Sequence, residues 1–185
     1  RVSGVYASAQ NLVCSLTTIS FMIPFAISNA IAVKTGFANG AGNFVDLKKY
    51  SLVGVVMCVG FMACSAVVFS SIPKPIVSLF TVDAELIKIC IPVMYILSIF
   101  QIFDGLQIAL AGICKGVKQT DIVLLANFVA YWLVSIPLGY TLAFKYNMNV
   151  SGFWVGLCSA AAILCFIMIF KLKRFVDIAY KKQEL

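Results

Sequence analysis

Asp104 is the side chain in this sequence that is best suited to chemistry, because it is a carboxylate inside an apolar stretch. The stretch runs from Leu86 to Ile113, and no other carboxylate lies as deep in an apolar segment. An aspartate at the centre of a membrane helix costs roughly 2.5 to 3.5 kcal/mol on insertion scales, so it is expected to face other helices or water and to serve a function. Asp104 is therefore a candidate functional residue.

Several polar and aromatic side chains are candidates for a cavity wall around Asp104. Gln101 and Gln107 stand three residues before and after it, so they should flank it on one broad helix face. Phe100 is a further candidate on the same segment. The set is completed by two residues that share a wide face of a later segment, Asn127 and Tyr131.

A second polar stripe lies near the start of the chain. Asn11, Ser15 and Thr18 recur at helical spacing. Two interpretations stay open. These side chains could hydrogen-bond across a helix interface in the membrane, or they could form the wall of a water-accessible cavity.

The composition is that of an integral membrane protein. Of the 185 residues, 62% are hydrophobic and 11% are charged, and the mean hydropathy is +1.03. Soluble domains average about 45–50% apolar and about 25% charged residues. A membrane helix needs about 20 mostly apolar residues. Five segments meet this requirement, near residues 5–33, 50–72, 86–112, 121–144 and 151–172. We expect an all-α membrane protein with one transmembrane domain over residues 1–185.

The distribution of positive charge predicts the topology. The net charge is +7, but its position along the chain argues against nucleic-acid binding. If the five segments alternate across the membrane, ten of the 14 Lys and Arg residues fall on one side. The positive-inside rule places that side in the cytoplasm and the N-terminus outside, with residues 173–185 as a cytoplasmic tail. The ten are Lys34, Lys48, Lys49, Lys115, Lys118, Lys171, Lys173, Arg174, Lys181 and Lys182.

Prolines and glycines indicate where the helices should bend or touch. Pro24 removes a backbone hydrogen bond inside the first segment and should act as a hinge. Pro137 and Gly139 should interrupt the fourth segment at a second hinge, and broken helices often border binding sites in transporters. The GxxxG spacing of Gly152 and Gly156 favours close helix contact.

The ends of the segments carry their own local signals. The glycine-rich stretch 34–43 lacks the GxxxxGK[ST] pattern of a phosphate-binding loop, so we expect a tight cytoplasmic turn. Thr120 or Asp121 should cap the fourth helix. Trp154 should mark the outer membrane interface, and the basic run 171–174 should end the fifth span.

No catalytic or metal-binding cluster is visible in the sequence. The chain has no His, and its seven cysteines include no CxxC pair, so they are interpreted as small apolar packing residues. One buried carboxylate leaves too few groups for a membrane-embedded hydrolase. We therefore expect neither an enzyme nor a cofactor, other than H⁺ or Na⁺ as a bound ion.

Four sets of residues resemble the motifs of the multidrug and toxic compound extrusion (MATE) transporters. They occur in the family's order and cover nearly the whole chain. The sets are residues 21–30 with Gly36 and 40–43; 103–107 with 112–116; Asn127 with Tyr131, Trp132 and 137–140; and 152–156.

The resemblance implies twelve helices in two six-helix lobes, of which this chain would be the last five helices, the C-terminal lobe without its first helix. The chain begins with Arg1 rather than Met and shows no secretory signal, so we expect a fragment or a processed product. The missing N-terminal lobe would be its partner. Another acidic residue of the coupling site would lie on the absent helix.

The function implied is that of a secondary antiporter working by alternating access. It would export cationic or amphiphilic, drug-like small molecules in exchange for Na⁺ or H⁺, with Asp104 as the coupling carboxylate. It would lie in a plasma membrane, in contact with lipid, and we favour a bacterial inner membrane. Two positions at which arginine is common in the family hold Lys34 and Lys115, which keep the charge without the bidentate geometry.

Two other functions stay open. A lipid-linked precursor flippase of a related superfamily would need basic residues in its cavity to bind a diphosphate, and none lies mid-membrane in this sequence. A non-transporting structural membrane subunit would use Asp104 only as a buried packing residue.

Overall fold

The protein is a bundle of long helices. The computed structural model describes residues 2–146 and 148–181, with side chains over 4–146 and 148–175. Five stretches are long and apolar enough to cross a membrane, Gly4–Gly40, Phe44–Ser71, Ala84–Gly116, Thr120–Lys145 and Asn149–Phe175. The expected class of all-α membrane protein is thereby confirmed. The elements are α1 (Val2–Gly40), α2 (Phe44–Ser71), α3 (Pro73–Ser78), α4 (Ala84–Gly116), α5 (Thr120–Asn127), η1 (Phe128–Ser135), α6 (Ile136–Tyr140), η2 (Thr141–Lys145) and α7 (Asn149–Lys181).

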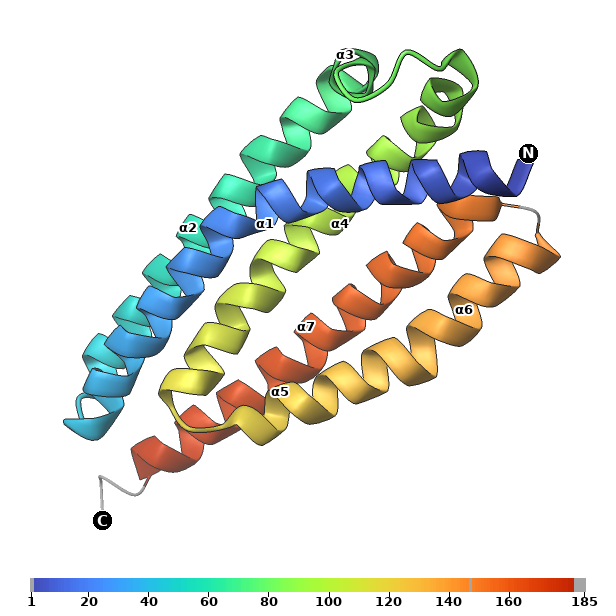
Figure 1. Cartoon of the computed structure of the whole chain (residues 1–185). Helices are drawn as coiled ribbons and strands as arrows, with labels where there is room; N and C mark the ends of the chain where they lie inside the picture. Colours follow the sequence, from blue (N-terminus) through green and yellow to red (C-terminus); the bar gives the residue numbers. More distant parts are fainter. Residues whose placement is uncertain (1, 147, 182–185) are drawn as a thin grey trace.

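Helix α4 lies at the centre of the bundle and packs against α1, α2 and α7 (Figure 1). The fourth span, from α5 to η2, packs mainly along α7. One apolar cluster, which includes Leu97 and Trp154, fills the half of the bundle near α3. A second cluster, which includes Ile113, Leu164 and Met168, fills the half near the start of α5. We call that second end the basic end, because Lys48, Lys115, Lys118, Lys171, Lys173 and Arg174 lie there.

Two glycines let α1 and α4 approach to backbone contact. A Cβ atom at Gly112 would lie 2.5 Å from the Ser28 carbonyl oxygen. A Cβ at Gly116 would collide with the Thr35 hydroxyl. The Ser28 hydroxyl donates to the Ile108 carbonyl oxygen at 2.8 Å and links the two helices. Small residues of this kind are how membrane helices pack closely without a hydrophobic driving force.

The predicted contact through Gly152 and Gly156 is confirmed. A Cβ at Gly156 would lie 2.8 Å from the Gly139 Cα, and one at Gly152 would lie 2.6 Å from the Ala143 nitrogen. Helix α7 therefore lies against the fourth span through backbone on both sides.

The fourth span is wound differently from the prediction. Pro137 does not break it; instead η1 and η2 are π-helical and α6 lies between them. The Ile136 N–H donates to the Tyr131 carbonyl oxygen five residues earlier, and Tyr146 does the same to Thr141. A proline lacks the N–H of a regular helix turn, and a wider turn is one way for the helix to continue past it. The predicted Thr120 or Asp121 cap is wrong, since Gln119 occupies the cap position without a side-chain hydrogen bond.

The glycine-rich stretch 34–43 is also mostly helix rather than a turn. Helix α1 continues through Gly36 to Gly40, and only residues 41–43 lie between it and α2. The reason is tertiary packing, because the backbone at Gly36 contacts Gly116 and Ala38 is buried near Leu47. Asn43 then caps α2 by accepting from the Asp46 N–H at 3.1 Å.

Two predictions for the fifth span need correction. The basic run 171–174 does not end the helix, because α7 continues to Lys181 and so includes most of the predicted tail; residues 182–185 lie outside the described residues. Trp154 is 3% exposed and packs in the core rather than facing the membrane interface.

Pro24 lies inside α1, which stays helical through it while changing direction along its length (Figure 1). Its carbonyl oxygen accepts from the Cys58 thiol at 3.7 Å. The structure holds one conformation, so the hinge at Pro24 stays a prediction.

Candidate functional site

Asp104 lies in the middle of α4, with 6% of its surface exposed. No hydrogen bond or ion pair reaches its carboxylate from any side chain that the structure describes. The Tyr131 phenol and the Cys165 thiol lie within electrostatic range of it. The carboxylate therefore lies in the electrostatic environment of η1 and α7 without a hydrogen bond or ion pair among the described residues.

Gln107 and Tyr131 form the hydrogen-bonded pair beside this carboxylate. The Gln107 Nε2 donates to the Tyr131 hydroxyl at 3.2 Å, and that hydroxyl lies 3.4 Å from Gln107 Oε1, to which it can donate instead. Both side chains are half-buried. A group that can donate or accept with little movement suits a neighbour that changes between a neutral and a charged form.

A cavity of about 210 Å³ adjoins Gln107; neither Asp104 nor Tyr131 is among its lining residues. Its wall combines aromatic and apolar side chains from α1, α4, α5 and α7 with Gln107, Asn127 and Lys115. The Asn127 amide donates to the Val123 carbonyl oxygen of its own helix at 2.8 Å, so its oxygen is the group left for a ligand. The aromatic members, Phe21 and Phe25, stack with their ring centres 5.7 Å apart.

Gln101 and Phe100 lie away from this cavity. Gln101 is fully buried, and neither its amide nitrogen nor its oxygen has a hydrogen-bond partner among the described residues. Phe100 packs edge-on against Trp154 at 5.6 Å. Trp154 in turn donates to the Gln10 Oε1 at 3.0 Å, a contact between α7 and α1 that sequence reasoning missed. The glutamine lies one helical turn before Cys14, and its tryptophan partner is 144 residues away in the sequence. No local sequence pattern reveals a contact between residues so far apart.

The polar stripe on α1 is exposed and bonded within its own helix. The Ser15 hydroxyl donates to the Asn11 carbonyl oxygen and the Thr18 hydroxyl to Cys14, each at 2.9 Å. Hydroxyl bonds of this kind bend helices slightly. The interhelical hydroxyl pair lies instead at Ser20 and Ser65, 3.3 Å apart.

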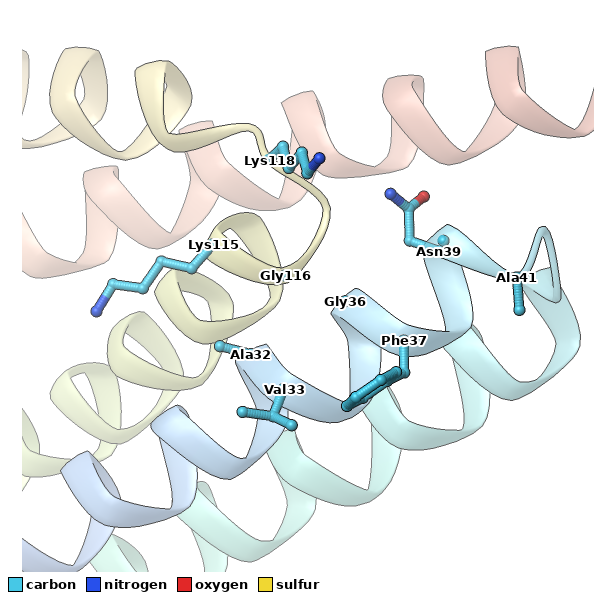
Figure 2. Close-up of a pocket in the computed structure, with 10 residues that line it drawn as sticks. Ala32, Val33, Gly36, Phe37, Asn39, Ala41, Lys115, Gly116 and Lys118 are labelled. Carbon is cyan, nitrogen blue, oxygen red and sulfur yellow. The ribbon is translucent and has the colours of Figure 1, made fainter.

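A larger groove of about 740 Å³ lies at the basic end, between the last turns of α1 and α4. Figure 2 shows Gly36 facing Gly116 in it, while the Lys115 and Lys118 side chains point in different directions. The two ammonium groups do not converge on one point, and Asp104 is not among the lining residues. This groove is therefore separate from the candidate cation site.

A metal-binding cluster is not found in the described part of the chain. No group of three His, Cys, Asp or Glu side chains comes together there. Any cation at Asp104 would use this carboxylate with neutral oxygens, which are the ligands that hard cations prefer.

Comparison with known proteins gives concordant results. A sequence model of the MatE family matches residues 1–141. A probable multidrug resistance protein NorM from Mesorhizobium japonicum is 30% identical over 167 residues, which cover 88% of this chain and 36% of that protein. A second probable multidrug resistance protein NorM, from Bacillus subtilis, is 25% identical over 181 residues, which cover 98% of this chain and 40% of that protein.

Solved structures share the fold. The eukaryotic MATE transporter AtDTX14 superposes with a TM-score of 0.84 at 23% identity, over 97% of this chain and 41% of that one. A MOP superfamily transporter from Pyrococcus furiosus superposes with a TM-score of 0.86 at 12% identity, over 94% and 39% of the two chains. The chain thus spans well under half the length of the proteins that it matches.

Proposed function

Because the chain belongs to the MatE family, we propose that it forms most of the C-terminal lobe of a secondary transporter that exports cationic or amphiphilic small molecules. The relatives named multidrug resistance protein are more than twice as long, which supports a facing lobe supplied by the rest of such a protein. The protein is an integral, multi-pass membrane protein. We place it in a plasma membrane, where export would protect the cell.

The observation that carries the proposal is the buried Asp104 carboxylate without a hydrogen bond or ion pair among the described residues. A charge in this position is costly unless it is neutralised. Either H⁺ or Na⁺ would neutralise it, and because both use the same oxygens, binding of one would exclude the other. The occupied and empty forms would differ by one charge at the centre of the bundle.

The membrane potential would drive the cycle. With the inside negative, entry of one cation from outside gains about 2.3 kcal/mol per 100 mV if the whole field is crossed. Loss of the cation to the inside would return Asp104 to its charged form. The Gln107–Tyr131 pair would then turn its donors toward the carboxylate, and this rearrangement would alter the wall of the adjoining cavity.

Replacement of Asp104 tests this role. Asp104→Asn keeps the shape of the side chain but cannot bind a proton or a cation in the same way, so we expect gradient-driven efflux to be abolished. Asp104→Glu should retain part of it. The measurement is dye efflux from proteoliposomes of the full transporter, with imposed Na⁺ or pH gradients and matched protein levels.

The control is Asp121→Asn, which alters an exposed carboxylate at the start of α5 and should leave efflux unchanged. If Asp104→Asn exports at the native rate with the same response to Na⁺ and pH, Asp104 is a packing residue and the proposed coupling is wrong.

A further inference from the structure

A second groove lies on the outer surface of the bundle, at the basic end and on the far side of α4 from the Gln107 cavity. We call it the lysine groove. It has a volume of about 560 Å³ and is bounded by α2, α4 and α7. Its floor is apolar, with Val55 of α2, Leu110 of α4 and Leu172 of α7 among its lining residues. None of the residues of the Gln107–Tyr131 pair lines it.

Two lysines from different helices stand at one end of the lysine groove. Lys48 lies in the first turns of α2 and Lys173 in the last turns of α7, and both line the groove. The wall along α2 reaches seven residues beyond Lys48, to Val55. That distance is about 10 Å at the rise of an α-helix. The groove therefore has two basic side chains at the membrane edge and apolar side chains toward the membrane centre.

One polar atom in the wall has no partner. The Ser51 hydroxyl oxygen is buried and makes no hydrogen bond within the described residues. It lies on α2 between Lys48 and Val55, one turn below the lysine. A buried hydroxyl without a partner costs free energy, so a ligand with an acceptor at this depth would be stabilised.

We propose that the lysine groove binds an anionic phospholipid of the cytoplasmic leaflet. The phosphate would lie between Lys48 and Lys173, the Ser51 hydroxyl would donate to an ester oxygen below it, and an acyl chain would follow the apolar floor past Leu110. The order of charge, hydroxyl and apolar surface along the groove matches the order of groups in a phospholipid. Basic pockets between membrane helices on the cytoplasmic side bind anionic headgroups for the same electrostatic reason. A cationic drug would be repelled by the two lysines.

The test compares two double variants with equal charge. Lys48→Gln with Lys173→Gln removes the two lining lysines, whereas Lys49→Gln with Lys171→Gln removes two exposed lysines that are not among the lining residues. The purified full-length protein is mixed with phosphatidylglycerol or phosphatidylcholine, and bound lipid is counted by native mass spectrometry. We expect the first pair to weaken phosphatidylglycerol binding roughly tenfold and the second less than twofold. Phosphatidylcholine should bind weakly to every form.

A third variant tests the acyl part of the site. Ser51→Leu places a larger side chain in the groove wall and removes the hydroxyl, while both lysines remain. It should also weaken phosphatidylglycerol binding several-fold. Ser71→Leu, at the exposed end of the same helix, is its control and should have no effect. If both double variants lose phosphatidylglycerol binding equally, the binding depends on general surface charge, and the proposal is overturned. Equal binding of the two lipids, or no effect of Ser51→Leu, would overturn it as well.

Discussion

At the scale of single residues, the site depends on how its polar groups are paired. The Asp104 carboxylate has no hydrogen bond or ion pair among the described residues. In contrast, Gln107 and Tyr131 lie 24 positions apart in the sequence, on different helices, and hydrogen-bond to each other. The pair holds a donor and an acceptor near the carboxylate without neutralising it. If Asp104 is the coupling carboxylate as proposed, the Tyr131 hydroxyl would position Gln107 beside it.

Removal of that hydroxyl should weaken transport without unfolding the protein. Tyr131→Phe deletes one hydrogen bond, which is worth about 0.5 to 1.5 kcal/mol, so we expect efflux to fall roughly two- to tenfold and the Na⁺ or pH dependence to shift. Tyr140→Phe, at an exposed position of the same span, should change neither. Identical pH profiles for Tyr131→Phe and the native protein would contradict this role.

The sequence predicts the burial of Asp104, because one carboxylate in an apolar run stands out by composition alone. It does not predict the separate environments of Gln101 and Gln107. Both stand three residues from Asp104, yet one is buried without a partner and the other bonds to Tyr131. That difference depends on which neighbouring helix each side chain meets, and helical spacing does not carry this information.

At the scale of elements, close backbone contact sets the positions of the helices. Helix α4 lies against α1 through Gly112 and Gly116, and α7 lies against the fourth span through Gly152 and Gly156. The contact through Gly152 and Gly156 was predicted from their GxxxG spacing, whereas the contact of α4 with α1 through Gly112 and Gly116 was not predicted. The π-helical winding of η1 and η2 was not predicted either, because proline at 137 is equally compatible with a kink or a break.

A side chain at Gly112 should separate α1 from α4. Gly112→Val places atoms against the Ser28 carbonyl, and overpacking of this kind costs about 1 to 3 kcal/mol. We expect a lower thermal midpoint, measured with a thiol-reactive dye that reports exposure of the buried Cys58, Cys90 and Cys114. Gly60→Val is the control, since a Cβ at Gly60 meets nothing within 4 Å. Equal midpoints for the two variants would show that the contact is not tight.

At the scale of the whole molecule, the asymmetry of charge predicts the orientation. The turn at 41–43 and the start of α5 lie at the basic end, whereas α3 lies at the other end (Figure 1). The number of spans and their order follow from hydropathy. Their exact ends do not, because α1 and α7 continue as helix beyond the apolar segments where packing or charge allows it.

Labelling from the two sides of the membrane tests this orientation. Cysteines introduced at Ala41 and Ser78, in a background without native cysteines, should react with a membrane-impermeant thiol reagent from opposite sides. Ala41 should be reached from the cytoplasm and Ser78 from outside. Labelling of both from one side would contradict the topology.

The 185-residue chain expressed alone should insert but not transport. It spans 36–41% of the length of the proteins it matches, so half of the expected cavity wall would be missing. Dye efflux from vesicles that hold only this chain is the measurement, and the full-length protein is the control. Gradient-driven efflux by the chain alone would indicate that copies of it assemble into a complete transporter.

The glycine contacts also bear on how relatives of this protein can diverge. The three atoms nearest to a Cβ at Gly54 all belong to the Ile31 side chain, whereas the atom nearest to a Cβ at Gly112 is the Ser28 carbonyl oxygen. A smaller residue at 31 can therefore permit a larger one at 54, and the two positions should covary among descendants of a common ancestor. No substitution at 28 removes its carbonyl, so Gly112 has no compensating partner. In an alignment of many relatives, positions 31 and 54 should therefore change together, whereas position 112 should remain glycine.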